Sequence, residues 1–203
     1  MTITRTMLPS AARYMALLAA LAVAAPLAAQ TQTAGQSGDE SRYILKDLGT
    51  FGGPNGNSNG GSVILNNQGT VVGGADTARW NPLCKCHVFH AFSWNKGPLK
   101  DLGTLPKGNH FSFAIAINAS GTIAGVSDNG VIDPVYGETF VATLWKKSGE
   151  IVNLGTFGGL WSLPFSINDR GQVVGGAENT IPDPDNLWGG LSDLPAPTLW
   201  RAA

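Results

Sequence analysis

The chain has 203 residues, a net charge of −1 and 13% charged residues, well below the roughly 25% of an average soluble protein. No cluster of Lys and Arg provides the basic surface that contact with nucleic-acid phosphates requires, so the composition argues against a nucleic-acid partner. Hydrophobic residues make up 43% of the chain and Gly is abundant, with 27 residues. This composition predicts a packed core that is built from strands and turns rather than from helices.

The first 29 residues are typical of a secretory signal peptide. Arg5 and Arg13 provide the positive region, residues 15–29 are apolar, and small residues precede Gln30. The apolar stretch is shorter than the ~20 residues of a membrane-spanning helix, and an uncleaved anchor is the alternative. We therefore expect a secreted protein, extracellular or periplasmic, with no membrane span in the mature chain. Residues 30–42 are small and polar, which predicts a flexible spacer before a domain at residues 43–203.

Three signatures recur along the chain in the same order. An Asp/Asn-Leu-Gly-Thr segment is followed by an Asn-x-x-Gly segment between apolar residues, and then by a Trp that closes a short apolar run. The spacing is about fifty residues, which predicts a repeat protein with three units. The three segments lie at 47–50, 101–104 and 153–156 for the first signature, at 66–69, 118–121 and 168–171 for the second, and at Trp94, Trp145 and Trp200 for the third.

Each repeat predicts a four-stranded antiparallel blade. Asn-x-x-Gly between apolar runs favours a type I turn, which would join a strand near 112–118 to a strand near 121–127. Two further strands follow, at 90–94 and 99–102 in the first complete repeat. Blades that cannot bury both faces alone do so by stacking, so we expect an all-β, β-propeller-like fold.

The chain begins and ends out of phase with the repeat. Tyr43–Leu48 predicts an isolated fourth strand that would complete the last sheet, which ends shortly after Trp200. Three blades are fewer than the ~4–8 that close a ring. The open alternatives are a shortened relative of longer repeat proteins, two chains that pair into one six-bladed ring, and three blades packed as a partial ring.

These segments resemble the bacterial extracellular repeat family that is named for its His-Ala-Phe motif (HAF repeat). The motif stands at His90-Ala91-Phe92, and the resemblance spans residues 43–200. The equivalent positions depart from it, as Val141-Ala142-Thr143 and as Ala196-Pro197-Thr198. The resemblance implies secretion and a propeller-like fold, and it implies no established activity.

We expect function on the face that carries the long loops, because variable loops on a rigid scaffold are the usual place for binding sites. These loops are predicted at 52–62, 106–110 and 158–163, and at 77–87, 129–139 and 179–196. In every repeat an acid lies three positions after the glycine that follows the second signature (Gly73, Gly125 and Gly175): Asp76, Asp128 and Glu178. The acids either cap turns at the strand ends or form a partial ring of carboxylates that coordinates Ca²⁺.

The loops also hold two cysteines and three tryptophans. Cys84 and Cys86 predict a local disulfide in an oxidising compartment, the alternatives being free or intermolecular thiols and a metal site with His87. Trp80, Trp161 and Trp188 are candidates for stacking on sugar rings or for anchoring a protein partner; the other interpretation is that they cap the blades.

No catalytic signature is present. The sequence has neither a Gly-x-Ser-x-Gly elbow nor His-Glu-x-x-His. We therefore expect a binding or surface-associated scaffold that is not an enzyme and has no cofactor or structural metal, apart from the Ca²⁺ alternative. Its partners would be a carbohydrate or protein ligand and a second copy of the chain. A secreted glycan-active hydrolase and a truncated fragment of a longer propeller protein are the alternatives.

Overall fold

A computed structural model describes residues 43–58, 63–82, 84–108, 110–182 and 193–202. The chain divides between Asp47 and Leu48, and the unit that starts at Leu48 contains all the strands described. The predicted signal peptide (1–29), the predicted spacer (30–42) and Trp188 lie outside the described residues. None of the described segments is a helix that is long and apolar enough to cross a membrane.

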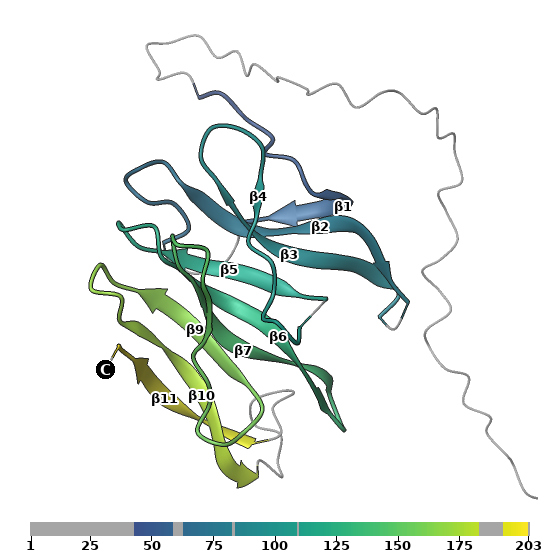
Figure 1. The fold of residues 1–203 in the computed structure, drawn as a ribbon, viewed down its shortest axis with the longest axis vertical. Coiled ribbons are helices and arrows are strands. Elements are labelled where there is room, and N and C mark those ends of the chain that lie inside the picture. Colours follow the sequence, from purple (N-terminus) through teal and green to yellow (C-terminus); the bar gives the residue numbers. More distant parts are fainter. Residues whose placement is uncertain (1–42, 59–62, 83, 109, 183–192, 203) are drawn as a thin grey trace, which may run out of the picture. The chain divides into compact units, whose positions relative to one another are not determined.

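The strands form three antiparallel sheets that follow one another along the chain (Figure 1), so the all-β prediction is confirmed. The first two sheets have four strands and the third has three. The first sheet contains β1 (Gly52–Asn57), β2 (Val71–Asn81), β3 (Cys86–Trp94) and β4 (Lys100–Asp101). The second contains β5 (Ser112–Ile117), β6 (Ile123–Asp133), β7 (Gly137–Trp145) and β8 (Ile151–Asn153). The third contains β9 (Ser162–Ile167), β10 (Val173–Pro182) and β11 (Asp193–Trp200).

The Asn-x-x-Gly turns are present in all three repeats. The amide of the Gly donates to the carbonyl oxygen of the Asn at 2.9–3.1 Å, as expected for a four-residue turn. The glycines take φ values of 77°, 86° and 75°, a region that L residues rarely adopt. The turn prediction is therefore confirmed at Gly69, Gly121 and Gly171.

The asparagines of these turns also connect the sheets. Nδ2 of Asn66 donates to the carbonyl oxygen of Asn118, and Nδ2 of Asn118 donates to that of Asn168, both at 3.1 Å. Asn66, Asn118 and Asn168 each also accept a backbone amide of their own turn through Oδ1. Each of the first two asparagines thus closes its own hairpin and holds the next one in place.

Serines make a second connection between sheets. Oγ of Ser112 accepts the amide of Ala91 on β3, and Oγ of Ser162 accepts the amide of Ala142 on β7, each at 2.8 Å. The register of the sheets places Pro197 of β11 at the position of these alanines. Because proline has no amide hydrogen, the third sheet lacks this outgoing bond.

The second sheet is buried on both faces. One apolar cluster joins it to the first sheet through Val72 and Ile117, and another joins it to the third sheet through Ala124 and Ile167. This position explains the nearly continuous apolar sequence of β5, whereas buried and exposed residues alternate over most of β9.

Two predictions about the first repeat are wrong. Residues 43–48 do not form the predicted strand. The expected loop at 52–62 contains β1, which pairs with β2 from Thr77 to Gly74. The third sheet consequently has no fourth strand among the described residues.

The loops predicted between the second and third strands are also largely wrong. Residues 77–81 and 86–87 extend β2 and β3, and residues 129–133 and 137–139 extend β6 and β7. The strand pairing shifts register after Asp76, after Asp128 and after Glu178. A sequence pattern of strict alternation fails at such a bulge, although the hairpin continues beyond it.

Candidate functional site

The three recurring acids bind the backbone of the segment that enters their own repeat. Oδ2 of Asp76 accepts the amide of Asn55 at 3.1 Å, and Oδ2 of Asp128 accepts the amide of His110 at 3.0 Å. Oε2 of Glu178 accepts the amides of Leu160 and Trp161 at 2.8 and 2.9 Å. All three acids are buried. This geometry fits the capping interpretation, and the three do not group as one cluster of metal ligands among the described residues.

A glycine lies against each acid. A Cβ atom on Gly108 would lie 2.1 Å from the backbone oxygen of Asp128, and one on Gly53 or Gly159 would lie 2.4 Å from the Cβ of the acid in its repeat. The Thr of each Leu-Gly-Thr segment donates its hydroxyl to the carbonyl oxygen of that glycine at 2.6–3.0 Å. The Leu-Gly-Thr signature therefore builds a clasp around a buried carboxylate, which is a structural role.

Aromatic side chains form a row beside these clasps. Phe89 of β3 stacks on Phe111 and on Phe113, with ring centroids 5.6 and 6.0 Å apart. Phe111 contacts Phe140 of β7 at 4.7 Å, and Phe140 contacts Trp161 at 5.1 Å. The row runs from the first sheet across the second to the start of the third.

A pocket of about 480 Å³ opens on this row between the first two sheets, within the size range of small-molecule sites. Four phenylalanines supply apolar walls, and acids, amides, histidines and a disulfide supply the rest. The lining residues are Asn57, Asp76, Asn81, Cys84, Cys86, His87, Phe89, His110, Phe111, Phe113, Glu138 and Phe140.

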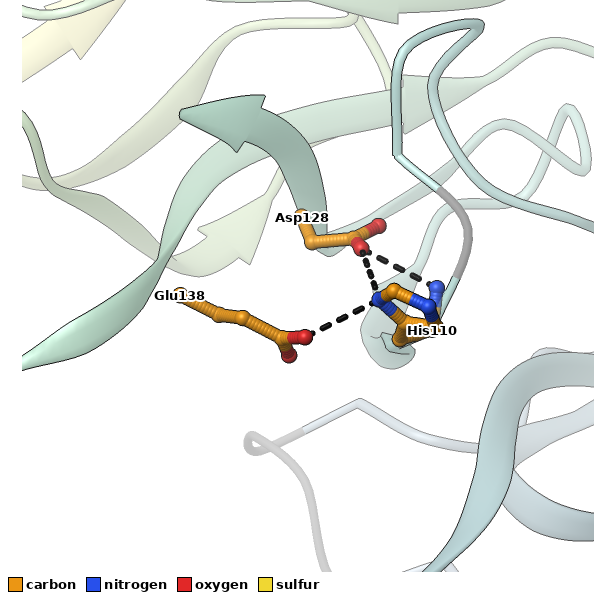
Figure 2. Close-up of side chains that lie close together, drawn as sticks. All are labelled: His110, Asp128 and Glu138. Atoms are coloured by element: carbon orange, nitrogen blue, oxygen red, sulfur yellow. Dashed lines mark hydrogen bonds and ion pairs between the residues drawn. The ribbon is translucent and has the colours of Figure 1, made fainter. Parts of the chain in front are cut away.

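The side chains of His110, Asp128 and Glu138 converge (Figure 2), and His110 and Glu138 also line this pocket. Nδ1 of His110 lies 2.9 Å from Oε1 of Glu138 and 3.9 Å from Oδ2 of Asp128. The side chain of Asp128 is 4% exposed, whereas those of His110 and Glu138 are 31% and 28% exposed. Within the described residues, these three side chains form the group that could hold a metal ion, because their donor atoms lie within 4.8 Å of one another.

The cysteines and Trp80 lie at the end of the β2–β3 hairpin. Cys84 and Cys86 are joined by a disulfide. His87 follows directly, and its Nδ1 donates to the carbonyl oxygen of Thr77 at 2.9 Å because a carbonyl can only accept. Trp80 is exposed and meets the ring of His87 edge-on at 5.3 Å. Trp80 and Trp161 therefore lie in different environments, the first exposed and the second packed against Phe140.

His90 of the His-Ala-Phe segment pairs with a carboxylate away from the pocket. Nδ1 of His90 lies 2.9 Å from Oδ2 of Asp101, and Oδ1 of Asp101 accepts the amide of Gly103. Burial alone raises the pKa of Asp101, but the hydrogen bonds from His90 and Gly103 and the charge of His90 outweigh it and lower the pKa below its ordinary value. In the third repeat Asn153 accepts the amide of Gly155 in the same way, so this position caps a turn.

A second pocket, of about 460 Å³, lies at the opposite end of the first two sheets, among the turns. Lys100, Lys146 and Lys147 line it, and Nζ of Lys146 is paired with Glu150 at 3.0 Å. It has no cluster of ligand-type side chains. We therefore take the phenylalanine pocket, together with the adjoining cluster of His110, Asp128 and Glu138, as the candidate functional site.

Comparisons with protein-family models, with curated proteins and with solved structures yield no match. The candidate site thus depends on the geometry alone. The sequence analysis did not identify His110 or the phenylalanine row as part of a site, although a signal existed for the row. Phe89 and Phe140 occupy the same register position, as do Phe111 and Trp161, so an aromatic residue recurs at each.

Proposed function

We propose that the chain is a secreted binding scaffold whose ligand site is the phenylalanine pocket. The observation that carries the proposal is a concave, largely apolar site with a few polar groups at its rim, which is the usual form of a small-ligand site. Four aromatic rings suit a ligand with a flat apolar face, such as the face of a sugar ring or an aromatic group.

Secretion is part of this proposal. The Cys84–Cys86 disulfide supports it, because disulfides persist in oxidising compartments and are rare in the cytosol. The apolar segment at residues 15–29 supports it as well, through its resemblance to a signal peptide.

The test uses a series of p-nitrophenyl glycosides, because each member carries both a sugar ring and an aromatic ring. Titration into the ¹⁵N-labelled chain should shift the amide resonances around Phe89, Phe111 and Phe140 and leave those around Lys100 and Lys146 unchanged. Phe111→Ala should weaken binding, and Phe157→Ala, which changes an exposed phenylalanine between β8 and β9, is the matched control. Binding that is confined to the turn end, or no binding of any member, would contradict the proposal.

A glycan hydrolase is the second candidate, and one observation favours it. A carboxylate oxygen of Asp128 and one of Glu138 lie within 4.8 Å of each other beside His110, close to the ~5–5.5 Å separation in retaining glycosidases. The buried position of Asp128 and its bond to the His110 amide favour the scaffold instead. The same titration separates the two, since a hydrolase would release yellow p-nitrophenolate and Glu138→Gln would abolish the release.

We also propose that the three sheets are part of a propeller-like arrangement that a second copy of the chain extends. In the first and second sheets, the face toward the next sheet in the chain is covered. Val72 and Ala124 occupy equivalent register positions on this face and are both 0% exposed. Val174 occupies that position in the third sheet and is 47% exposed. Leu199, which lies opposite Val174 in the β10–β11 pairing, is exposed as well.

Light scattering after size exclusion tests this assembly. The wild-type chain should be a dimer, and Val174→Lys should be a folded monomer, since a charge in an apolar interface is costly. Val135→Lys, at an exposed valine in the β6–β7 hairpin, is the control and should remain dimeric. A wild-type monomer would contradict the proposed dimer and leave the pocket proposal unaffected.

A further inference from the structure

We propose that His110, Asp128 and Glu138 bind one Zn²⁺ ion beside the phenylalanine pocket, which His110 and Glu138 also line. The three residues come from the segment before β5, from β6 and from β7, and their side chains point toward one another (Figure 2). They offer one imidazole nitrogen and two carboxylate oxygens, which are common zinc ligands. Zinc binding here does not depend on whether the pocket also takes an organic ligand.

The distances suit a zinc ion. In a tetrahedral site with bonds of 2.0–2.1 Å, two ligand atoms lie about 3.3 Å apart. The two contacts of the His110 Nδ1 atom, at 2.9 Å to Glu138 and 3.9 Å to Asp128, lie on either side of that value. All three donor atoms lie within 4.8 Å of one another, so rotations of the partly exposed side chains of His110 and Glu138 would close the site around an ion. The ion would take the place of the proton on Nδ1 between His110 and Glu138, and a neutral imidazole that binds through Nδ1 carries its one proton on Nε2.

The donor set discriminates between ions. Two carboxylates and a neutral imidazole carry a net charge of −2, which attracts a cation. Ca²⁺ takes six to eight oxygen ligands, whereas a nitrogen donor among three ligands suits zinc and similar transition metals. A site with three protein ligands keeps its fourth position for water or a bound molecule.

The third repeat shows which part of the cluster is structural. Leu160 occupies the position of His110, and its amide donates to Glu178 at 2.8 Å just as the His110 amide donates to Asp128 at 3.0 Å. The cap on the acid therefore needs only the backbone of this position. The imidazole is an addition to it, and His110→Leu removes the imidazole while retaining a residue that the fold already uses there.

Titration calorimetry of ZnCl₂ into the untagged full chain tests the proposal. Wild type should bind one Zn²⁺ per chain, and CaCl₂ should not compete for it. His110→Leu and Glu138→Gln should each weaken binding at least about tenfold, the lower limit seen when even the second-shell partners of a metal are lost. His90→Val is the matched control, because His90 pairs with Asp101 alone and Val141 stands at its position in the second repeat.

Circular dichroism shows whether each variant is folded, and Co²⁺ supplies an independent readout through its visible ligand-field absorption. A Co²⁺ spectrum that wild type and His90→Val share and His110→Leu lacks would support the site. The proposal is overturned if wild type binds no Zn²⁺, if folded His110→Leu binds as wild type does, or if His90→Val loses as much affinity as His110→Leu.

Discussion

The contact between the first and second sheets and the contact between the second and third share the same hydrogen bonds between side chains and backbone. They differ in other side chains that lie beside these bonds. Both have an asparagine link between turns, a serine that accepts an amide from the preceding sheet, and a buried acid that caps the incoming segment. At the capping segment the first contact has His110 and Phe111, whereas the second has Leu160 and Trp161. What the repeats share maintains the fold, and what they do not share is where we locate function.

The pockets follow this difference. The first contact leaves about 480 Å³ that is lined by phenylalanines and by His110 and Glu138. At the equivalent place the second contact leaves about 200 Å³, because the larger indole of Trp161 lies against Phe140 there; a separate cavity of about 620 Å³ lies at the turn end of this contact. One scaffold thus holds an open site and a nearly filled one.

The largest effect should come from the asparagine link. Asn118→Ala removes the buried side chain that accepts the Thr122 amide and donates to Asn168, so we expect a loss of about 3 kcal/mol in the free energy of unfolding. Asn168→Ala should cost only about 1 kcal/mol, because Asn168 is exposed and its Nδ2 donates within its own turn, to Gln172. Urea unfolding measures both, and equal losses would show that the link between sheets contributes nothing.

A smaller effect should come from the serine bond. Ser162→Ala leaves the buried amide of Ala142 without its partner and should cost about 2 kcal/mol. In an Ala142→Pro background no such amide exists, as at Pro197 in the third sheet, so Ser162→Ala should then cost less than about 1 kcal/mol. A double-mutant cycle by urea unfolding measures the difference. No coupling between the two substitutions would mean that the serine acts through packing.

These two bonds indicate how far the sequence could lead. The Asn-x-x-Gly and Leu-Gly-Thr signatures predicted the turns and the order of the sheets, because a short turn with its own φ requirement is a local property. The bond from Asn66 to Asn118 joins residues 52 positions apart, so no local pattern could reveal it. The His110–Glu138 contact depends on a register shift after Asp128, which alternation along β6 does not predict.

A still smaller effect should separate the two aromatic positions. The buried Nε1 of Trp161 has no hydrogen-bond partner among the described residues. Trp161→Phe removes this unsatisfied group and should change stability by less than about 1 kcal/mol, while enlarging the second pocket toward the first. Phe111→Trp is the reciprocal change, and it should block ligand binding by filling the first pocket. Ligand binding that survives Phe111→Trp would place the site elsewhere.

The smallest effect is a dependence on pH. Because folding lowers the pKa of Asp101, its ionised form stabilises the protein above the ordinary pKa of about 3.9, and this stability is lost as pH falls through the lowered value. Asp101 is 44% exposed, so the contribution should stay below about 1 kcal/mol. Asp101→Asn, which copies Asn153, should keep the turn and remove this part of the acid sensitivity. Urea unfolding at pH 5 and pH 3 measures it, and an unchanged difference would contradict the assignment.

The most direct test of the account is a crystal structure of the chain grown with ZnCl₂, with anomalous scattering data collected at the zinc edge. It would display both contacts between sheets in one molecule. We predict one anomalous peak bonded to His110, Asp128 and Glu138 at the phenylalanine pocket, and none beside Leu160 and Trp161. A first contact without a peak, or a peak at the second contact, would contradict the claim that function is located where the repeats differ.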